Sequence, residues 1–296
     1  MSNSITLITK YITSILDKVY KKAAVTSILD APSQFVMETS AAGTYMIPKI
    51  SMQGLVDYAK STGFTAGDAN LAWEAWTLAY DRGRKFGIDR IDDQESAGIL
   101  LANLASEFLR TKVAPEIDAI RFSRIAGTAG IGGAQADLTT ASAAMASFKV
   151  ATAVLDDAEV PEEGRVCFMT PTFYNLIEEA IGASRLITTN TPDARIVSYN
   201  GIRFVKAPET RMYDEITLAT TGDGGYSAAV GAVGLNFMMI DPTAVLQVTK
   251  HAKGRLWSPD DNILSDGWLY DYRIYHDAKV LDNKKAGIYV HKQAAA

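Results

Sequence analysis

The sequence contains very little cysteine and histidine, two residues on which metal binding, covalent cross-linking and much of catalysis depend. Its 296 residues include one cysteine and three histidines. A single cysteine excludes a disulfide framework and a cysteine-rich zinc site within one chain, which fits folding in a reducing cytoplasm. Cys167 lies in the apolar run 166–169. This position predicts a buried strand residue that is inert to thiol reagents.

The histidines, acidic pairs and glycine clusters form no recognisable catalytic pattern. The residues concerned are His251, His276, His291, Asp92, Asp93, Asp156, Asp157, Asp260 and Asp261. No histidine has a second ligand at metal-binding spacing, and the acidic pairs stand where helices begin or the chain turns. The glycine clusters at 127–133 and 222–225 match neither the dinucleotide fingerprint nor the P-loop. The sequence therefore predicts no catalytic residue, no metal site and no cofactor.

Long hydrophobic runs and strongly basic segments are also missing. The longest apolar stretches fall far short of the roughly 20 residues that span a membrane, and no basic run precedes an apolar core as in a secretory signal. A formal net charge of −5 argues against a surface built as a whole for nucleic acid. The composition is otherwise that of an ordinary globular chain, long enough for two modest domains. We expect no membrane association.

The N-terminal third predicts a helix followed by a long two-stranded loop. Apolar residues recur at three and four spacing over 5–22, which predicts an amphipathic helix that packs either on its own domain or on a neighbour. Residues that favour β-structure over 44–54 and 71–91 predict two strands around a turn-rich tip at 61–68.

These two strands are too long and too mixed in polarity to pack wholly on their own domain. Strands of about 15 residues form a ribbon of roughly 50 Å, whereas a compact chain of this length has a radius of gyration of about 19 Å. We therefore predict contacts with another subunit through Tyr58, Phe64, Trp73, Trp76, Asp81, Arg82, Arg84 and Lys85. The basic residues of this set either protect a solvated strand edge or pair with acids of a neighbour, and we favour the second interpretation.

The rest of the chain predicts a long helix, a hinge and a mixed domain. A helical pattern over 93–125 is interrupted by Pro115, which predicts a kink there. The predicted hinge that follows consists of Gly127, Gly130, Gly132 and Gly133. Beyond it the expected elements are a helix at 139–157, a strand at 165–169, a helix capped by Thr170, a hairpin about Asn200-Gly201, and strands at 244–249, 268–276 and 287–291.

Five segments along the chain carry a resemblance to a known family. They are Gly54, Tyr58, Gly63 and Phe64; 81–86 with Asp89 and Asp92; 113–119; 241–245; and 271–277. In this order they resemble the extended loop, its return, the spine helix and the final strands of tailed-phage major capsid proteins, whose fold is named after phage Hong Kong ninety-seven. The resemblance covers nearly the whole chain, although no single motif decides it.

This resemblance implies an α+β tailed-phage capsid fold. Its parts would be an N-terminal arm at 1–40, an extended loop at 41–91, a spine helix and peripheral domain at 92–130, an axial α+β domain at 131–244 and return strands of the peripheral domain at 245–296. The implied function is structural and not enzymatic: pentamers and hexamers that form an icosahedral shell around the phage genome in the virion, assembled in the host cytoplasm.

The resemblance also implies partners and leaves alternatives open. Besides further copies of the chain, we expect a separate scaffolding protein, a portal, a decoration protein and double-stranded DNA held on the inner surface without sequence specificity. An encapsulin-like nanocompartment shell has the same fold and is the nearest alternative. An oligomeric enzyme with an unrecognised site is a remote one.

Overall fold

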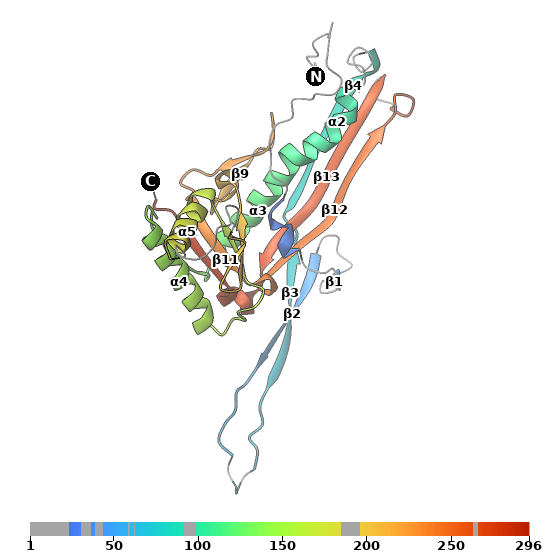
Figure 1. Ribbon diagram of the computed structural model, residues 1–296. Helices are drawn as coiled ribbons and strands as arrows, with labels where there is room; N and C mark the ends of the chain where they lie inside the picture. Colours follow the sequence, from blue (N-terminus) through green and yellow to red (C-terminus); the bar gives the residue numbers. More distant parts are fainter. Residues whose placement is uncertain are drawn as a thin grey trace.

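The computed structural model describes residues 24–30, 37–38, 44–58, 60–61, 63–91, 99–184, 196–262 and 266–295. Figure 1 shows a central lobe of sheet and helices, an elongated sheet with a long helix along it, and a hairpin that projects away from both. The helix predicted over 5–22 lies outside the described residues, as does the predicted start of the long helix at residue 93.

A six-stranded mixed sheet forms the middle of the central lobe. Its strand order is β5 (Gly132–Gln135), β14 (Ile288–Lys292), β11 (Leu235–Ile240), β6 (Val166–Met169), β8 (Ile202–Lys206) and β7 (Ser198–Tyr199). Cys167 and Met169 of β6 pack with α4 (Ala141–Asp157) and α5 (Pro171–Ser184). Val166 and Phe168 pack on the other face with α3 (Ala114–Ala126). Burial on both faces explains why these strands are continuous apolar runs.

The cap predicted at Thr170 and the hairpin turn predicted at Asn200-Gly201 are both present in this lobe. The Thr140 hydroxyl accepts a hydrogen bond from the Ala143 N–H at the start of α4, and the Thr170 hydroxyl does the same for the Phe173 N–H at the start of α5. Such N-caps satisfy backbone donors that have no partner within the helix. Asn200 and Gly201 both have positive φ angles, as a tight hairpin turn between β7 and β8 requires.

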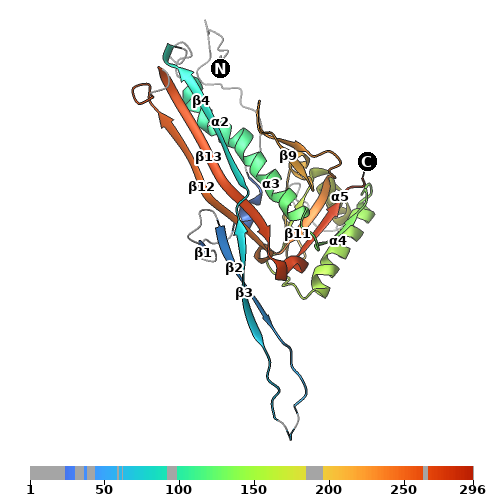
Figure 2. The same ribbon diagram turned by 180° about the vertical axis from the view of Figure 1, so that it is seen from behind.

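The elongated part is a three-stranded antiparallel sheet covered on one face by helices. Its strand order is β12 (Val245–Trp257), β13 (Gly267–Val280) and β4 (Tyr80–Asp89). Along it run α2 (Ile99–Phe108), a π-helical turn at Leu109–Val113 and then α3. The Phe86 and Phe108 rings meet edge to face, with 4.9 Å between their centroids. Figures 1 and 2 show the helices along one face of this sheet only.

The projecting hairpin consists of β2 (Thr44–Met52) and β3 (Ala69–Thr77), with the short β1 (Met37–Glu38) beside β2. Its register runs from Thr44 opposite Thr77 to Met52 opposite Ala69. The remaining elements of the described residues are short 3-10 helices at Thr26–Leu29, Glu209–Arg211, Pro242–Ala244 and Asp282–Gly287, and the short strands β9 (Ile216–Leu218) and β10 (Tyr226–Ala228).

The strand predicted over 71–91 is in fact two strands with different partners. β3 pairs with β2 in the hairpin, whereas β4 pairs with β13 in the elongated sheet. The break falls at Leu78 and Ala79. There the Ala79 N–H donates to the buried Asp277 carboxylate, which replaces a strand partner at the crossing point. The expected extended loop therefore ends at Thr77, and the residues from Tyr80 onward belong to a sheet of the body.

Two further expectations need correction. Gly132 and Gly133 belong to β5, which pairs in parallel with β14, so they are not part of a free hinge. A side chain at Gly133 would place its Cβ 2.4 Å from the Val290 carbonyl oxygen, so a close approach of two strands requires this glycine. In addition, β14 lies in the central sheet, although it was expected among the final strands of the peripheral domain.

The long helix changes its hydrogen-bonding pattern next to Pro115. This residue is buried in the first turn of α3, directly after the π-helical turn at 109–113. Proline has no N–H to donate to the preceding turn, so the regular α-helical pattern cannot pass through it unchanged. The helix therefore has a wider turn on the N-terminal side of Pro115, and the kink predicted at this residue stays a prediction. Among the described residues, no helix is long and apolar enough to cross a membrane.

Candidate functional site

The hairpin exposes a concentration of large apolar side chains. Leu55 and Phe64 expose 106% and 91% of their reference surface. Other exposed apolar residues of the hairpin are Ile50, Met52, Val56, Tyr58, Leu71 and Trp73. The Tyr58 and Phe64 rings lie 5.0 Å apart, and they are the predicted contact residues nearest the tip. A concentration of exposed apolar side chains on a two-stranded ribbon is typical of a protein–protein contact, because such a ribbon is marginally stable alone.

The base of the hairpin is fixed to the body. Trp76 is buried with Tyr45, Leu78 and Leu246 in a small core of their own. An ion pair joins Lys279 to Glu74 across the same region. Trp76 was predicted to contact another subunit, but it is a core residue of its own chain. The body therefore sets the direction in which the exposed part of the hairpin projects.

The charged residues of β4 are also held mainly within the chain. The Arg82 Nε donates to the Glu116 carboxylate on α3 at 2.7 Å, and its Nη1 donates to the Ala219 carbonyl oxygen at 2.8 Å. Asp81 forms an ion pair with Arg273 on β13. The acidic partner of Arg82, which was expected on a neighbour, thus lies in its own chain, because β4 has joined the sheet beneath α3. The ion pair of Asp81 leaves its side chain 43% exposed, and its contact with a neighbour stays a prediction.

The other two basic residues of β4 lie on opposite faces of the sheet. Arg84 shares the helix-covered face with Arg82, and its Nη1 donates to the Gly222 carbonyl oxygen at 2.8 Å. Lys85 is exposed on the open face, where no ion pair joins it to another described residue. The alternation of side chains along a strand explains this separation. Of the predicted charged contacts, Lys85 is thus the one that remains fully available to a neighbour.

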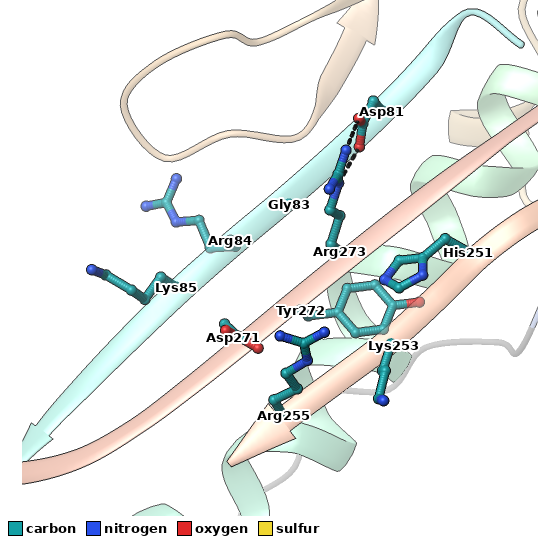
Figure 3. A pocket seen from close by; sticks show the side chains of 10 residues that line it. All are labelled: Asp81, Gly83, Arg84, Lys85, His251, Lys253, Arg255, Asp271, Tyr272 and Arg273. Atoms are coloured by element: carbon teal, nitrogen blue, oxygen red, sulfur yellow. Dashed lines mark hydrogen bonds and ion pairs between the residues drawn. The ribbon is translucent and has the colours of Figure 1, made fainter. Parts of the chain in front are cut away.

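The open face of the elongated sheet carries a surface that we call the basic strip, consisting of Lys85, Lys253, Arg255 and Arg273. Figure 3 shows these side chains around a hollow on β4, β13 and β12. One row across the sheet consists of Arg255, Asp271 and Lys85. The next row consists of Lys253, Arg273 and Gly83. The missing side chain at Gly83 deepens the hollow. Lys253 and Arg255 are not predicted from the sequence, because they come next to Lys85 only through β13.

A buried polar cluster beneath α3 is the second arrangement that the sequence did not reveal. Asp118 is fully buried and accepts hydrogen bonds from the Val25 N–H, the Thr26 N–H and the Thr26 hydroxyl. It also forms an ion pair with the buried Arg211 at 2.7 Å. Several donors on one carboxylate compensate the cost of burying its charge. Asp118 therefore joins the start of the described chain, α3 and the central lobe at one point.

The buried titratable side chains provide no catalytic arrangement. Burial raises the pKa of the Cys167 thiol, which is consistent with the predicted buried strand residue. Burial lowers the pKa of His276 to about 4, with a further contribution from the nearby charge of Arg121. It also lowers the pKa of His291, whose Nδ1 lies 3.1 Å from the Asn236 amide. Within the described ranges, no group of three acidic, histidine or cysteine side chains could hold a metal ion.

Comparison with known proteins identifies the architecture. No family model and no curated protein sequence matches the chain. Solved structures do match it, over nearly its whole length. The capsid structure of cyanophage P-SCSP1u superposes with a TM-score of 0.69 at 16% identity, covering 98% of this chain and 93% of that chain. The mature capsid of bacteriophage PhiM1 gives 0.71 at 10% identity, with 97% and 92% covered.

A third match, the capsid of Ralstonia phage GP4, has a TM-score of 0.60 at 11% identity and covers 100% of this chain and 99% of that chain. The chain has the tailed-phage capsid fold. The fold expected from the sequence is thereby confirmed. Among the described residues, the apolar hairpin and the open face of the elongated sheet are two surfaces that no other element of the chain covers, whereas α2 and α3 cover the other face of that sheet.

Proposed function

We propose that this chain is the major capsid protein of a tailed bacteriophage. Copies would join as pentamers and hexamers into an icosahedral shell that encloses the genome. The observation that carries the proposal is the hairpin, whose exposed apolar residues project from a well-packed body of the capsid fold. A single subunit gains nothing from exposing these side chains to water, whereas a neighbouring copy that covers them removes the cost.

The shape of the hairpin indicates how copies associate. A projection that contacts a different surface on the next copy is a heterologous contact, and such contacts close into rings when the rotation permits. Because Trp76 and its neighbours fix the base of the hairpin, little orientational freedom is lost when the exposed part docks. The role is structural and not enzymatic. Other expected partners are a separate scaffolding protein, a portal, a decoration protein and double-stranded DNA on the inner surface, in a virion assembled in the host cytoplasm.

Electron microscopy of the purified full chain, at several salt concentrations, tests the shell. We expect closed shells, or rings of five and six copies. If neither forms from the chain alone or together with a scaffolding protein, the proposal is wrong. Particles that contain an enzyme cargo instead of DNA would show that the chain forms a nanocompartment of the encapsulin kind.

Substitution in the hairpin tests the contact itself. The double variant L55S/F64S removes the two most exposed apolar side chains of the hairpin without touching its base. We expect it to fold with an unchanged melting temperature and to form few rings or shells. The matched control is V197S/V230S, which removes two exposed apolar side chains from the central lobe. Equal assembly of both variants would show that the hairpin tip is not an assembly contact.

A further inference from the structure

The strand edges of the chain differ in how they are protected against pairing with another chain. An unpaired edge presents a row of backbone N–H and C=O groups, and proteins protect such edges with charged side chains, proline, bulges or short strands. β12 and β4 form the two edges of the elongated sheet, and both carry several lysines and arginines. The register of β12 also shifts between Thr249 and His251. The other edge strands β1, β5, β7, β9 and β10 have at most four residues each.

The hairpin strand β3 has none of these protections. It is the last strand of the sheet β1, β2, β3, and Figure 1 shows this hairpin projecting from the body. Its 9 residues contain no lysine, arginine or proline, and its pairing with β2 has no register shift. The one charged residue of β3, Glu74, forms an ion pair with Lys279 of the body. On β2, in contrast, Pro48 interrupts the row of outer N–H groups, and β1 pairs with part of that edge.

Pro48 also indicates which backbone groups of β3 point outward. Proline has no N–H, so within a sheet it stands where its nitrogen faces away from the partner strand. Pro48 lies opposite Trp73. In an antiparallel pair of this kind the two residues do not bond to each other, so the N–H and C=O of Trp73 point away from β2. Two positions along β2, the Ile50 carbonyl oxygen accepts from the Asn283 side chain, as this assignment requires.

The outward backbone groups of β3 border an apolar face of the hairpin. By alternation, the groups of Leu71 and Ala75 point outward together with those of Trp73. Leu71 and Trp73 expose 52% and 49% of their reference surface. The residues opposite this set on β2, whose side chains share the same face, are Met46, Pro48, Ile50 and Met52. The edge therefore offers main-chain hydrogen bonds beside exposed apolar side chains, as a site for strand addition does.

The edge of β3 is complementary to the same edge of a second copy. Two identical edges related by a twofold axis perpendicular to the sheet run antiparallel, so each outward N–H meets an outward C=O. An axis at Trp73, the middle of β3, pairs this residue with itself and places Leu71 beside the small Ala75 of the partner subunit. Glu74 then lies opposite Ala72, so no like charges face each other. The other described edges are charged, interrupted or short, which leaves β3 as the partner that the chain itself supplies.

We infer that two copies of the chain associate by antiparallel pairing of their β3 edges about a twofold axis at Trp73, which joins two hairpins into one sheet. A two-stranded ribbon is marginally stable in water, whereas a wider sheet with an apolar face is stable. The inference rests on the proposed function, because a shell brings the hairpins of many copies together. It adds a main-chain contact between identical edges to the contact of hairpin side chains with a different surface.

Proline substitution tests the edge without altering the bonds within the hairpin. Ala75→Pro removes an outward N–H, as Pro48 does on β2. The lost hydrogen bonds occur twice by symmetry, so the full-length chain should associate about tenfold more weakly in sedimentation, with an unchanged melting temperature of the subunit. Ala75→Thr keeps the N–H and is the matched control, which should associate like the unmodified chain. Equal association of the two variants would overturn the inference.

A proline at the neighbouring parity tests the assigned direction of the backbone groups. The N–H of Ala72 faces Lys49 on β2, so Ala72→Pro should open the hairpin and expose the amides of β2 to hydrogen exchange. Ala75→Pro should leave these amides protected. If both variants open the hairpin equally, the outward groups are assigned wrongly and the inference is wrong. It is also wrong if Ala75→Pro self-associates normally but no longer binds a scaffolding protein, since the edge then belongs to that partner.

Cross-linking tests the axis independently of shell formation. Cys167 is fully buried, so a cysteine introduced at the surface reacts without background. Trp73→Cys should form disulfide-linked dimers on mild oxidation, because residues paired across such an axis have Cα atoms about 5.5 Å apart, within the range of a disulfide. Val150→Cys, exposed on α4, should not form them.

The combination of results separates this contact from the capsid function. Dimers linked through residue 73 without rings or shells would support the edge contact and refute the capsid. Shells without these dimers, and with unimpaired assembly of Ala75→Pro, would support the capsid and refute the edge contact.

Discussion

The buried His276 gives a quantitative test of the packing between the elongated sheet and α3. The residue is 1% exposed, and neither ring nitrogen has a hydrogen-bond partner among the described residues. Its pKa falls from 6.5 to about 4, mainly through burial and further through Arg121. The ring is therefore neutral in the folded chain. As the pH decreases below about 6.5, the unfolded chain binds a proton that the folded chain does not, so stability is lost toward pH 4.

The size of this loss follows from the two pKa values. A difference of about 2.5 between 6.5 and about 4 corresponds to at most about 3.4 kcal/mol, at about 1.36 kcal/mol per pKa unit. Between about pH 7 and about pH 4.5, we expect His276 to account for about 2.5 kcal/mol of lost unfolding free energy. Full burial of the ring means that solvent screening does not reduce this figure greatly.

The assay is urea unfolding of the unassembled subunit at these two pH values, for the unmodified chain and for His276→Leu. The carboxylates that titrate in this range contribute to both proteins, so the difference between them isolates the histidine. We expect the variant to gain about 2.5 kcal/mol relative to the unmodified chain on going to the lower pH. His251→Leu, on the open face, is the control. Parallel loss of stability in the unmodified chain and in His276→Leu would refute the assigned environment of the ring.

Three further substitutions test the interior. Asp118→Asn leaves a buried guanidinium without its carboxylate and should lower the unfolding free energy by about 3–5 kcal/mol in urea, whereas an unchanged midpoint would exclude a buried ion pair. Gly133→Ala should lower the unfolding free energy by about 1–3 kcal/mol, because its Cβ meets a carbonyl oxygen of β14. Gly182→Ala, with open space around the new Cβ, should change the unfolding free energy little when both variants are measured by calorimetry. Arg82→Glu should lower the melting temperature of the isolated subunit, since its partner is internal. A loss of assembly alone, with an unchanged melting temperature, would contradict that.

The sequence predicts the central lobe well because its signals are local. Thr170 caps the helix that follows it directly, and Asn200-Gly201 turns the chain within its own hairpin. The position of Cys167 in a short, wholly apolar run predicts a strand buried on both faces. Each of these inferences depends on neighbours close in sequence, which a single chain displays directly.

The sequence fails where pairing partners are distant. The run from 71 to 91 has the composition of a strand throughout, and nothing within it shows that residues 80–89 pair with β13, nearly two hundred positions later. Separation along the chain also hides Glu116, 34 positions away, from Arg82, and it hides β14 from the glycines of β5. Asp118 is an ordinary helical acid in the sequence, and its role appears only when Thr26 and Arg211 meet it.

The sequence indicated only part of the basic strip. Lys85 is conspicuous within the basic segment of β4. Lys253 and Arg255 alternate with other residues, which indicates that they share one face of a strand, but the sequence does not show which strand pairs with it. Only β13, placed between them, makes one surface of these three cations. Charged residues at alternate positions of strands that share a sheet predict such a strip only when the order of the strands is known.

The apolar character of the hairpin predicts how ring formation depends on salt. Contacts between exposed charges are screened once the Debye length falls to about 3 Å near 1 M salt. The hairpin contact is apolar, so added salt does not weaken it and a strongly excluded salt strengthens it. Rings of copies should therefore persist as sodium chloride is raised to about 1 M. Mass measurement of the species in solution along a salt series would show this. Rings that dissociate as the salt concentration rises would mean that the hairpin is not the apolar contact that closes each ring.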